Sequence, residues 1–347
     1  MTRPKFVLAS TSDRYDFEWE RAWLAEIPDF EFDLRPAPTA GSIDTIAEYA
    51  RDADALLVSS REVIDRVAIA KLERCKVIAR YAVGLDHIDL DAAAESGIVV
   101  THYPMYCTRE VADHALAFIL ALNRRIVELD RDLRSGAWVT HAHQTRRILR
   151  GPVLPLREST VGLLGIGRIG TEVAARLAPF GARIIAHDPH VTDDEIRRRE
   201  AEPVSFTELL ESSDTITVHC PLTPESRGMI DGAALARMKT GAMLVNTARG
   251  PIVVSNSLVD ALDSGRLGGA ALDVVDPEPL PLESRLYTLP NVILSPHSAY
   301  YSERSVEIIR RETLLAAVDV LMGRMPPVVA NPAVLDRVSL APPRSVG

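Results

Sequence analysis

The sequence has few cysteines and no long apolar segment. Its 347 residues include only three cysteines, Cys75, Cys107 and Cys220, which are widely spaced and form no Cys-x-x-Cys pair. Such a set argues against a disulfide framework or a metal site and favours reduced thiols in the cytoplasm. No apolar run approaches the roughly 18 residues that a membrane-spanning helix needs. The run that begins at Lys5 is short, so we interpret it as a first strand and not as a signal peptide.

The chain also lacks an excess of basic residues. Its 39 Lys and Arg residues against 48 Asp and Glu give a net charge of −9, which argues against nucleic-acid binding as the main activity. An apolar content of 47% and a charged content of 25% are typical of a globular protein. Because 347 residues exceed the usual size of one hydrophobic core, two domains are expected.

Short apolar runs of strand type alternate with helical segments along most of the chain. The runs are 5–9, 30–34, 55–59, 76–79 and 98–101, followed by 160–164, 183–186, 215–219, 242–246, 270–274 and 292–294. This alternation predicts parallel sheets that are covered by helices on both faces. We therefore expect an α/β protein with two doubly wound parallel-sheet domains.

Long helical segments are predicted over 110–133 and 302–321. The first half of 110–133 is apolar nearly all round, so we expect it to be buried on several sides. A dimer interface and packing inside the monomer both account for such burial. The chain from 332 to 347 has little periodicity and is expected to be poorly ordered.

Three glycines after a buried run give the clearest chemical signal. Gly165, Gly167 and Gly170 form Gly-x-Gly-x-x-Gly between the predicted strand 160–164 and a helix. Such a turn lets a pyrophosphate approach the backbone at a helix N-terminus, where free N–H groups favour an anion. Asp188 follows at about the expected separation of roughly 20 residues, at the end of the next strand. Its carboxylate would bind ribose hydroxyls and repel a 2′-phosphate, so NAD is expected over NADP.

Polar residues also follow three later predicted strands. These segments are Asn246-Thr-Ala-Arg249-Gly250, Leu272-Asp-Val-Val-Asp-Pro-Glu278-Pro279 and Ser295-Pro-His297. In an open α/β sheet, ligands bind outside the carboxyl ends of the strands. We therefore expect all three segments to surround the nicotinamide end of the cofactor.

The order of these motifs resembles that of the D-isomer-specific 2-hydroxyacid dehydrogenase family. The resemblance covers nearly all of residues 1–330 and includes the segment His219-Cys-Pro-Leu-Thr223. It implies a flavodoxin-like substrate domain made of residues 1–106 and 298–331. A Rossmann NAD-binding domain of residues 107–297 would be inserted between these two parts.

The resemblance implies an NAD(H)-dependent oxidoreductase that interconverts a 2-keto acid and a D-2-hydroxy acid. Arg249 would hold the substrate carboxylate and carbonyl, His297 would supply the proton, and Glu278 would orient His297. The chemistry agrees, because a guanidinium offers a planar fork of donors and an imidazole titrates near neutrality. Cofactor contacts are expected from Gly165, Gly167, Arg168, Ile169, Gly170, Asp188, His219, Cys220, Pro221, Thr247, Ala248 and Asp273.

The predicted substrate pocket departs more from the family pattern. The family binds the substrate carboxylate at a Gly-x-Gly turn, whereas this chain has Ala82 before Val83 and Gly84. We retain Val83 and Gly84, and add Arg80, Ser60 and Tyr300, as expected substrate-binding residues. The segment 298–303 resembles the C-terminal-binding-protein-like subgroup, which has Trp at the position of Tyr300. A core role is the alternative for that aromatic ring.

Other interpretations stay open. An NAD(H)-responsive binding protein, similar to corepressors of that subgroup, and a phosphite-type dehydrogenase would keep the same arginine, glutamate and histidine.

The basic segment 138–157 contains His141 and His143; we expect a solvated or subunit-contacting loop, with a substrate-facing loop as the alternative. Expected partners are a small 2-keto or 2-hydroxy acid and a second copy of the chain, without nucleic acid, membrane or metal.

Overall fold

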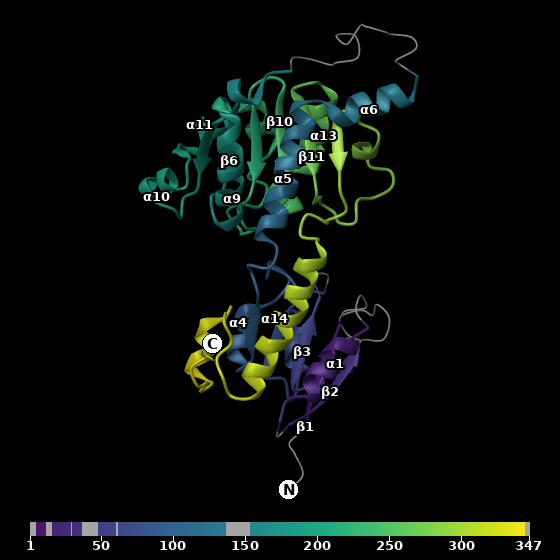
Figure 1. The fold of residues 1–347 in the computed structure, drawn as a ribbon, viewed down its shortest axis with the longest axis vertical. Coiled ribbons are helices and arrows are strands. Elements are labelled where there is room, and N and C mark those ends of the chain that lie inside the picture. Colours follow the sequence, from purple (N-terminus) through teal and green to yellow (C-terminus); the bar gives the residue numbers. More distant parts are fainter. Residues whose placement is uncertain are drawn as a thin grey trace. The chain divides into compact units, whose positions relative to one another are not determined.

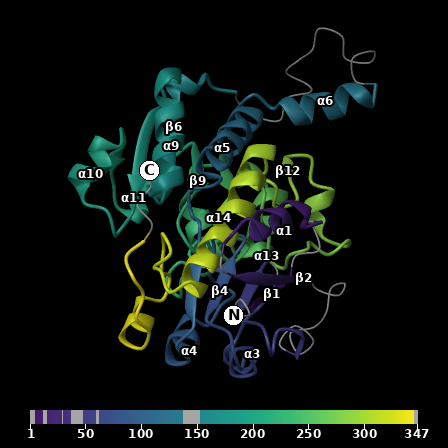
Figure 2. The same ribbon diagram turned by 60° about the horizontal axis from the view of Figure 1, so that its bottom comes forward.

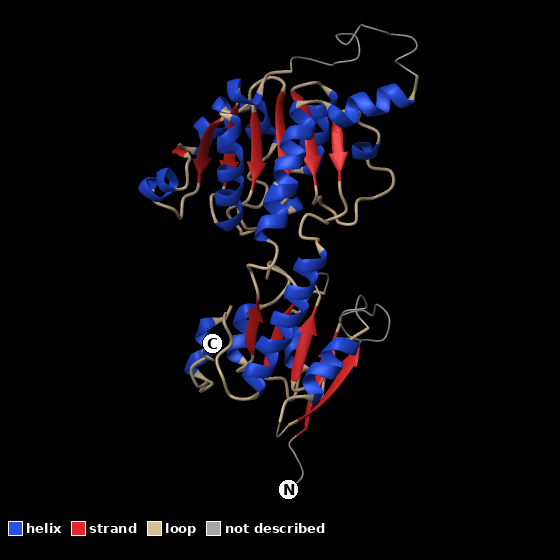
Figure 3. Cartoon of the chain, in the orientation of Figure 1, coloured by secondary structure: helices blue, strands red, loops and turns tan. Residues whose placement is uncertain are grey.

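The chain forms two compact units, each with its own sheet. The computed structural model describes residues 5–11, 16–28, 30–36, 48–59, 62–136 and 153–343. Unit 1 consists of Met1–Tyr106 and Ser302–Gly347, and unit 2 of Cys107–Tyr301. Unit 2 is thus inserted into unit 1, and the second part of unit 1 begins at Ser302, whereas the family resemblance implies residue 298. Figure 3 shows helices and strands in both units.

The sheet of unit 1 has five parallel strands in the order β2-β1-β3-β4-β5. The strands are β1 (Lys5–Ser10), β2 (Glu31–Pro36), β3 (Ala55–Val58), β4 (Val77–Arg80) and β5 (Val99–His102). The helices include α1 (Glu18–Ala25), α3 (Arg66–Ala70), α4 (Leu90–Glu95) and α14 (Glu303–Leu321). This strand order is that of flavodoxin-like sheets. All four side chains of β3 and all four of β4 are buried, so the centre of the sheet is covered on both faces. Helix α14 packs on β3, β4 and β5 (Figures 1 and 2).

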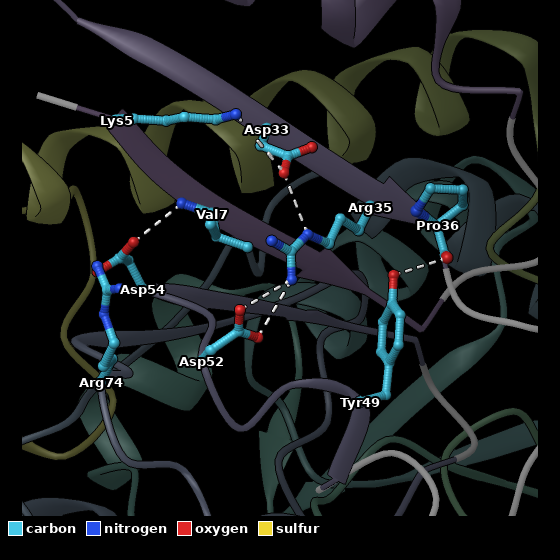
Figure 4. A network of polar contacts seen from close by, with 9 residues as sticks. All are labelled: Lys5, Val7, Asp33, Arg35, Pro36, Tyr49, Asp52, Asp54 and Arg74. Atoms are coloured by element: carbon cyan, nitrogen blue, oxygen red, sulfur yellow. Dashed lines mark hydrogen bonds and ion pairs between the residues drawn. The ribbon is translucent and has the colours of Figure 1, made fainter. Parts of the chain in front are cut away.

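Ion pairs and hydrogen bonds connect the first strands of unit 1 (Figure 4). Arg35 on β2 donates to Asp33 at 3.2 Å and to both carboxylate oxygens of Asp52 at 3.1 Å. Buried Asp54, just before β3, accepts the Val7 N–H of β1 at 2.9 Å. These contacts fix the position of β3 against β1 and β2.

The C-terminal segment covers the edge strand β5. The amide of Asn331 accepts from the Val100 N–H at 2.8 Å and donates to the Ile98 carbonyl at 2.9 Å. The 3₁₀ helix η5 (Pro332–Asp336) follows, packs on α4 and buries Val334. Residues 332–343 are therefore folded onto unit 1, which corrects the expectation of a poorly ordered tail for these residues. The sequence pattern shows no periodicity because a 3₁₀ helix of five residues is too short to give one, and packing on α4 fixes its position.

The sheet of unit 2 has seven parallel strands in the order β12-β11-β10-β9-β6-β7-β8. They are β6 (Thr160–Leu164), β7 (Arg183–His187), β8 (Glu202–Pro203), β9 (Thr215–Val218), β10 (Ala242–Asn246), β11 (Leu267–Leu272) and β12 (Val292–Leu294). The helices include α5 (Thr108–Asn123), α6 (Ile126–Arg134), α9 (Arg168–Leu177), α10 (Asp193–Arg198), α11 (Phe206–Ser212), α12 (Gly232–Arg237) and α13 (Ser255–Asp263). The two sheets confirm the predicted fold class. The short β8 was not predicted.

The helix predicted over 110–133 is divided into α5 and α6. Arg125 takes a left-handed φ of 54° between them, and its buried guanidinium donates to the Gly268 carbonyl at 2.6 Å. This tertiary contact outweighs the preference for a continuous helix. The apolar side chains of α5, such as Ala115 and Ile119, are buried with those of α9, β10 and β11. Packing within unit 2 therefore accounts for the apolar character of α5.

Candidate active site

The carboxyl ends of the strands in unit 2 form one row. The register pairs Leu164 with Val218, Val218 with Asn246, Asn246 with Leu272, and Leu272 with Leu294. The segments that follow these residues therefore begin at the same edge of the sheet. The strand order reverses between β6 and β9, which is the position where doubly wound sheets bind dinucleotides.

The three glycines of the turn between β6 and α9 have different surroundings. A Cβ on Gly165, whose φ is 94°, would lie 2.6 Å from the Cys220 nitrogen, and one on Gly170 would lie 2.4 Å from the Gly165 oxygen. These two glycines let the turn, the helix and the β9 end approach each other closely. A Cβ on Gly167 would meet no described atom within 4 Å. Gly167 is the N-cap of α9, and no side chain caps the N–H groups of the first turn. These N–H groups are therefore available to an anion in the open space beside Gly167.

Asp188 lies directly beside this turn. It follows β7, and its carboxylate accepts from the Ile166 and His190 N–H groups at 3.0 Å each. The side chain is half-buried. This position agrees with that of an acid that binds the adenosine ribose next to the glycine turn.

Directly after β9 and β10, two buried side-chain atoms have no hydrogen-bond partner among the described residues. They are Nδ1 of His219 and Oγ1 of Thr247, which follow the paired residues Val218 and Asn246. Burial lowers the pKa of His219 to about 3, so the imidazole is neutral at physiological pH. Buried polar atoms are normally hydrogen-bonded. Together with the glycine turn and Asp188, these atoms fit a bound dinucleotide.

Arg249 is held by the turn that follows β10. The Asn246 side chain donates to the Arg249 carbonyl at 2.9 Å and accepts from the Ala248 N–H at 3.0 Å. A Cβ on Gly250 would lie 1.9 Å from the Val275 carbonyl oxygen. Only glycine therefore allows the Arg249 turn to lie against the segment that leads to Glu278.

His297 and Glu278 form a direct pair. Nδ1 of His297 lies 2.6 Å from Oε1 of Glu278, and the two side chains are 39% and 40% exposed. Burial raises the pKa of the Glu278 carboxyl, but the hydrogen bond and charge of His297, the Val275 backbone and the charge of Arg249 together lower it more, so the pKa lies below its ordinary 4.5. Because Nδ1 is engaged by a carboxylate, Nε2 is the ring nitrogen left for proton transfer.

His297 has an unusual backbone, and Asp273 holds the segment that carries it. The φ of His297 is 52°, in the left-handed region that non-glycine residues seldom adopt. The buried Asp273 carboxylate accepts from the Ser298 N–H at 2.8 Å, from the Ala299 N–H at 3.0 Å and from the Ser295 hydroxyl. Both of its oxygens thus bind protein donors, and the expected contact of Asp273 with the nicotinamide stays a prediction.

The remaining predicted cofactor residues lie around the same strand ends. Arg168 and Ile169 are the first residues of α9, and Cys220 and Pro221 follow His219. Burial raises the pKa of Cys220 to about 11, so its thiol stays protonated. Ala248 precedes Arg249 in the turn after β10.

The predicted substrate residues lie in both units. Arg80 is the buried last residue of β4, and the Val83 carbonyl contacts Nδ1 of His102 at 2.8 Å just before Gly84. Ala82 is not among the described residues with positive φ, so alanine is compatible with this turn. Tyr300 is half-buried, and its ring packs edge-on against Tyr301 at 6.4 Å.

Some of the predicted residues belong to ranges that the structure does not describe. Ser60 and the basic residues His141, His143, Arg146, Arg147 and Arg150 lie outside the described residues.

Among the helices of the described ranges, none has the length and apolar character that a membrane crossing requires. A group of three or more His, Cys, Asp or Glu side chains suited to a metal ion is likewise not found in those ranges.

Ser295 and His114 are not among the site residues that the sequence predicts. In the Ser-Pro-His segment only the histidine has a predicted role. His114 falls within the predicted apolar helix, yet its Nε2 lies 3.0 Å from the Ser295 hydroxyl oxygen. A histidine within an otherwise apolar helical run was the available signal.

The fold and the strand ends of unit 2 define a dinucleotide-dependent oxidoreductase. Residues 116–299 match the family described as D-isomer specific 2-hydroxyacid dehydrogenase, NAD binding domain. A glyoxylate reductase of Thermofilum pendens is 42% identical over 304 residues, which cover 85% of this chain and 86% of that protein. A D-3-phosphoglycerate dehydrogenase of Mycobacterium leprae is also 42% identical, but the match covers 71% of this chain and 45% of that longer protein.

Solved structures agree with this relationship. The TT0316 protein of Thermus thermophilus has a TM-score of 0.82 and 35% identity, with coverage of 94% of this chain and 99% of that chain. A D-lactate dehydrogenase of Aquifex aeolicus, solved with NAD and lactic acid, has a TM-score of 0.78 and 28% identity, with coverage of 96% and 98%. The chain belongs to the D-isomer-specific 2-hydroxyacid dehydrogenase family. It is an NAD-dependent 2-hydroxyacid dehydrogenase.

Proposed function

We propose that the protein reduces a small 2-keto acid to a D-2-hydroxy acid, with Arg249, Glu278 and His297 as its catalytic residues. The observation that carries the proposal is the 2.6 Å contact between Nδ1 of His297 and Oε1 of Glu278. It directs Nε2 of an acid–base group away from its carboxylate partner. NAD, when bound as NADH, supplies the hydride.

The proposed residues divide the remaining work. Arg249 binds the substrate carboxylate and polarises the ketone through its planar donor fork. Nε2 of His297 donates a proton to the carbonyl oxygen as the carbonyl carbon accepts the hydride, giving a hydroxyl group. The ionised Glu278 stabilises the charged imidazolium before the transfer and keeps the ring oriented. Oxidation of the hydroxy acid runs through the same steps in reverse.

Cofactor selection is assigned to Asp188 and the glycine turn. The carboxylate of Asp188 would accept hydrogen bonds from the ribose hydroxyls and repel the extra phosphate of NADPH. We propose unit 2 as the NAD-binding domain and unit 1 as the substrate domain, with Arg80, Val83, Gly84 and Ser60 as substrate-binding residues. Tyr300 of unit 2 is proposed to face the substrate as well.

The substrate class is small 2-keto acids. Support comes from the glyoxylate reductase of Thermofilum pendens, because the match extends over most of both chains. The match to the phosphoglycerate dehydrogenase of Mycobacterium leprae spans about half of that protein, and so gives weaker support for its substrate. None of the described contacts favours the binding-protein or phosphite alternatives.

We further propose a homodimer in the cytoplasm. The observation that supports self-association is Ile126 at the start of α6, which is 55% exposed. Light scattering at several concentrations would test it, with twice the monomer mass expected. A single species of monomer mass would contradict the dimer without affecting the proposed chemistry.

The decisive experiment is a steady-state assay of NADH oxidation at neutral pH. Glyoxylate, hydroxypyruvate, pyruvate, phenylpyruvate and branched 2-keto acids form the substrate panel, with NADPH in parallel. We expect turnover of a small keto acid with NADH, and a loss of about 10²–10⁴-fold in kcat for His297→Asn. Unchanged turnover in that variant would overturn His297 as the proton donor. Binding of NADH without turnover of any acid would overturn the proposed reaction and favour a sensor.

A further inference from the structure

A chain of hydrogen bonds connects α5 to the segment that carries His297. Nε2 of His114 lies 3.0 Å from Oγ of Ser295, and the Ser295 hydroxyl donates to Oδ1 of Asp273. The same Oδ1 lies 3.9 Å from the His114 ring nitrogen. All of these residues belong to unit 2.

The direction of the chain follows from the chemistry of its groups. The Asp273 side chain is 2% exposed, and its carboxylate can only accept hydrogen bonds when ionised. The Ser295 hydroxyl therefore donates its single hydrogen bond to Asp273. Its oxygen can then only accept a hydrogen bond from His114. Nε2 of His114 must then carry a proton and act as the donor. This places the proton of the His114–Ser295 hydrogen bond on Nε2 of His114.

Asp273 in turn holds His297 from both sides. It binds Ser295, two residues before His297, and the N–H groups of Ser298 and Ala299, just after it. The His297 N–H also donates to the Asp273 carbonyl at 2.8 Å. The left-handed backbone of His297 is uncommon for a non-glycine residue, and such a conformation persists only where its surroundings fix it.

We propose that His114 is a positioning residue for His297, acting through Ser295 and Asp273. The proposal rests on the proposed function, in which His297 donates the proton. The His114 N–H fixes the rotamer of Ser295, and Ser295 with Asp273 sets the backbone angle from which the His297 ring projects. Loss of the donor leaves the catalytic ring in place but less well aligned.

Packing alone does not require a histidine at position 114. The ring is 26% exposed and packs edge-on against Phe118, with centroids 4.4 Å apart. Leucine is a good helix former and provides an apolar contact for Phe118, but it has no donor. Glutamine places an N–H donor at nearly the distance of Nε2. The pair His114→Leu and His114→Gln therefore separates packing from hydrogen bonding.

The test is the kinetics of His114→Leu, His114→Gln and Ser295→Ala, with the full-length protein and the keto acid identified by the assay above. We expect His114→Leu to lower kcat about tenfold, because misalignment of reacting groups slows the chemical step. The KM for NADH should stay within about twofold, and His114→Gln should recover most of the rate. Ser295→Ala should lose a similar factor, and the double variant with His114→Leu should lose no more, because both act through one chain.

The isotope effect distinguishes positioning from damage to the fold. With NADH deuterated at the transferred position, slower chemistry raises the observed isotope effect on kcat. A smaller fraction of folded enzyme lowers kcat and leaves the isotope effect unchanged. Additive losses in the double variant, or an unchanged isotope effect in His114→Leu, would overturn the proposal. If His297→Asn keeps full activity, the proposed function fails first; if only the His114 variants behave like wild type, this inference alone fails.

Discussion

At the scale of the residue, the candidate site combines predictable chemistry with unpredictable geometry. The sequence proposes Arg249, Glu278 and His297 through the family motifs, because hydride transfer to a keto acid calls for a cation, a proton donor and an orienting acid. The structure brings Glu278 and His297 into contact. Their supports could not be selected in the same way. The left-handed φ of His297 and the contacts of Asp273 depend on chain segments that are distant in sequence.

Glu278 gives a pH-dependent prediction. Its pKa lies below the ordinary 4.5, so the carboxylate is ionised at neutral pH, and the stabilisation it provides is lost only as the pH falls through that lowered pKa. Glu278→Gln removes this charge at every pH. The protonated form of His297, the proposed proton donor, is then less favoured, and we expect the basic limb of kcat/KM for the keto acid to move to lower pH by about one unit.

The measurement is the pH profile of kcat/KM for keto-acid reduction between about pH 5 and 9. The exposed Glu283, in the same segment, offers the matched control Glu283→Gln, which should leave the profile unchanged. If the midpoint of the basic limb is the same in Glu278→Gln and the wild type, the carboxylate does not stabilise the proposed proton donor.

At the scale of the element, the sequence predicted strands better than helix ends. The alternation of apolar runs located β6, β10 and β12 with the observed bounds, because buried parallel strands are apolar throughout. The division of α5 and α6 at Arg125 was not predictable, because it depends on a contact with Gly268 far along the chain. The two-residue strand β8 is too short, and contains a proline, to give a strand pattern.

Substitution of two glycines in the turn from β6 into α9 should affect different properties, the stability of the fold for Gly170 and the affinity for NADH for Gly167. Gly170→Ala places a Cβ 2.4 Å from a backbone oxygen, so we expect a loss of about 1–3 kcal/mol in the free energy of unfolding. Gly167→Ala meets open space and has an extended backbone, so the fold should be retained. Its methyl group would, however, occupy the approach of the pyrophosphate, and the Kd for NADH should rise about tenfold or more.

Chemical denaturation and titration of NADH fluorescence measure the two effects separately. Gly170→Ala is the control for Gly167→Ala, because it adds the same methyl group to the same turn but should lower the free energy of unfolding. Equal NADH affinity in Gly167→Ala and the wild type would show that the pyrophosphate does not approach this glycine.

The segment over β5 gives a second prediction at this scale. Asn331→Ala leaves the buried Val100 N–H and Ile98 carbonyl without their side-chain partner, which costs about 1–3 kcal/mol of stability. Urea unfolding followed by circular dichroism measures the change. Asn256→Ala on the exposed surface of α13 is the matched control, with an expected change below about 0.5 kcal/mol. Equal unfolding midpoints for the two variants would contradict a structural role of Asn331.

At the scale of the whole molecule, alternating elements predicted two parallel sheets, but not what completes each unit. Assigning both chain ends to one domain came from the family resemblance, because periodicity carries no information on which segments pack together. The boundary at Ser302 follows from contacts of α14 with β3, β4 and β5. The η5 segment was missed because it has no periodic pattern and is fixed by packing on α4.

The separate cores of the two units predict a local response to the cofactor. NADH without substrate should slow amide hydrogen exchange in unit 2, most strongly around Gly165–Gly170, Asp188 and Thr247, because binding stabilises the folded state there. Exchange within β1, β2 and β3 of unit 1 should change less. Mass spectrometry of exchanged peptides, with NADPH as the control nucleotide, measures the difference. Equal protection in both units would contradict a cofactor site confined to unit 2.

The insertion of unit 2 into unit 1 also sets an order of events during synthesis on the ribosome. The five strands of unit 1 are translated first, but α14, which packs on three of them, is translated only after the whole of residues 107–301. Unit 2 is continuous and can fold as soon as it leaves the exit tunnel, since domains generally fold as units. A nascent chain therefore completes its second unit before its first, and the apolar sheet face that awaits α14 is the surface that a chaperone would protect in the meantime.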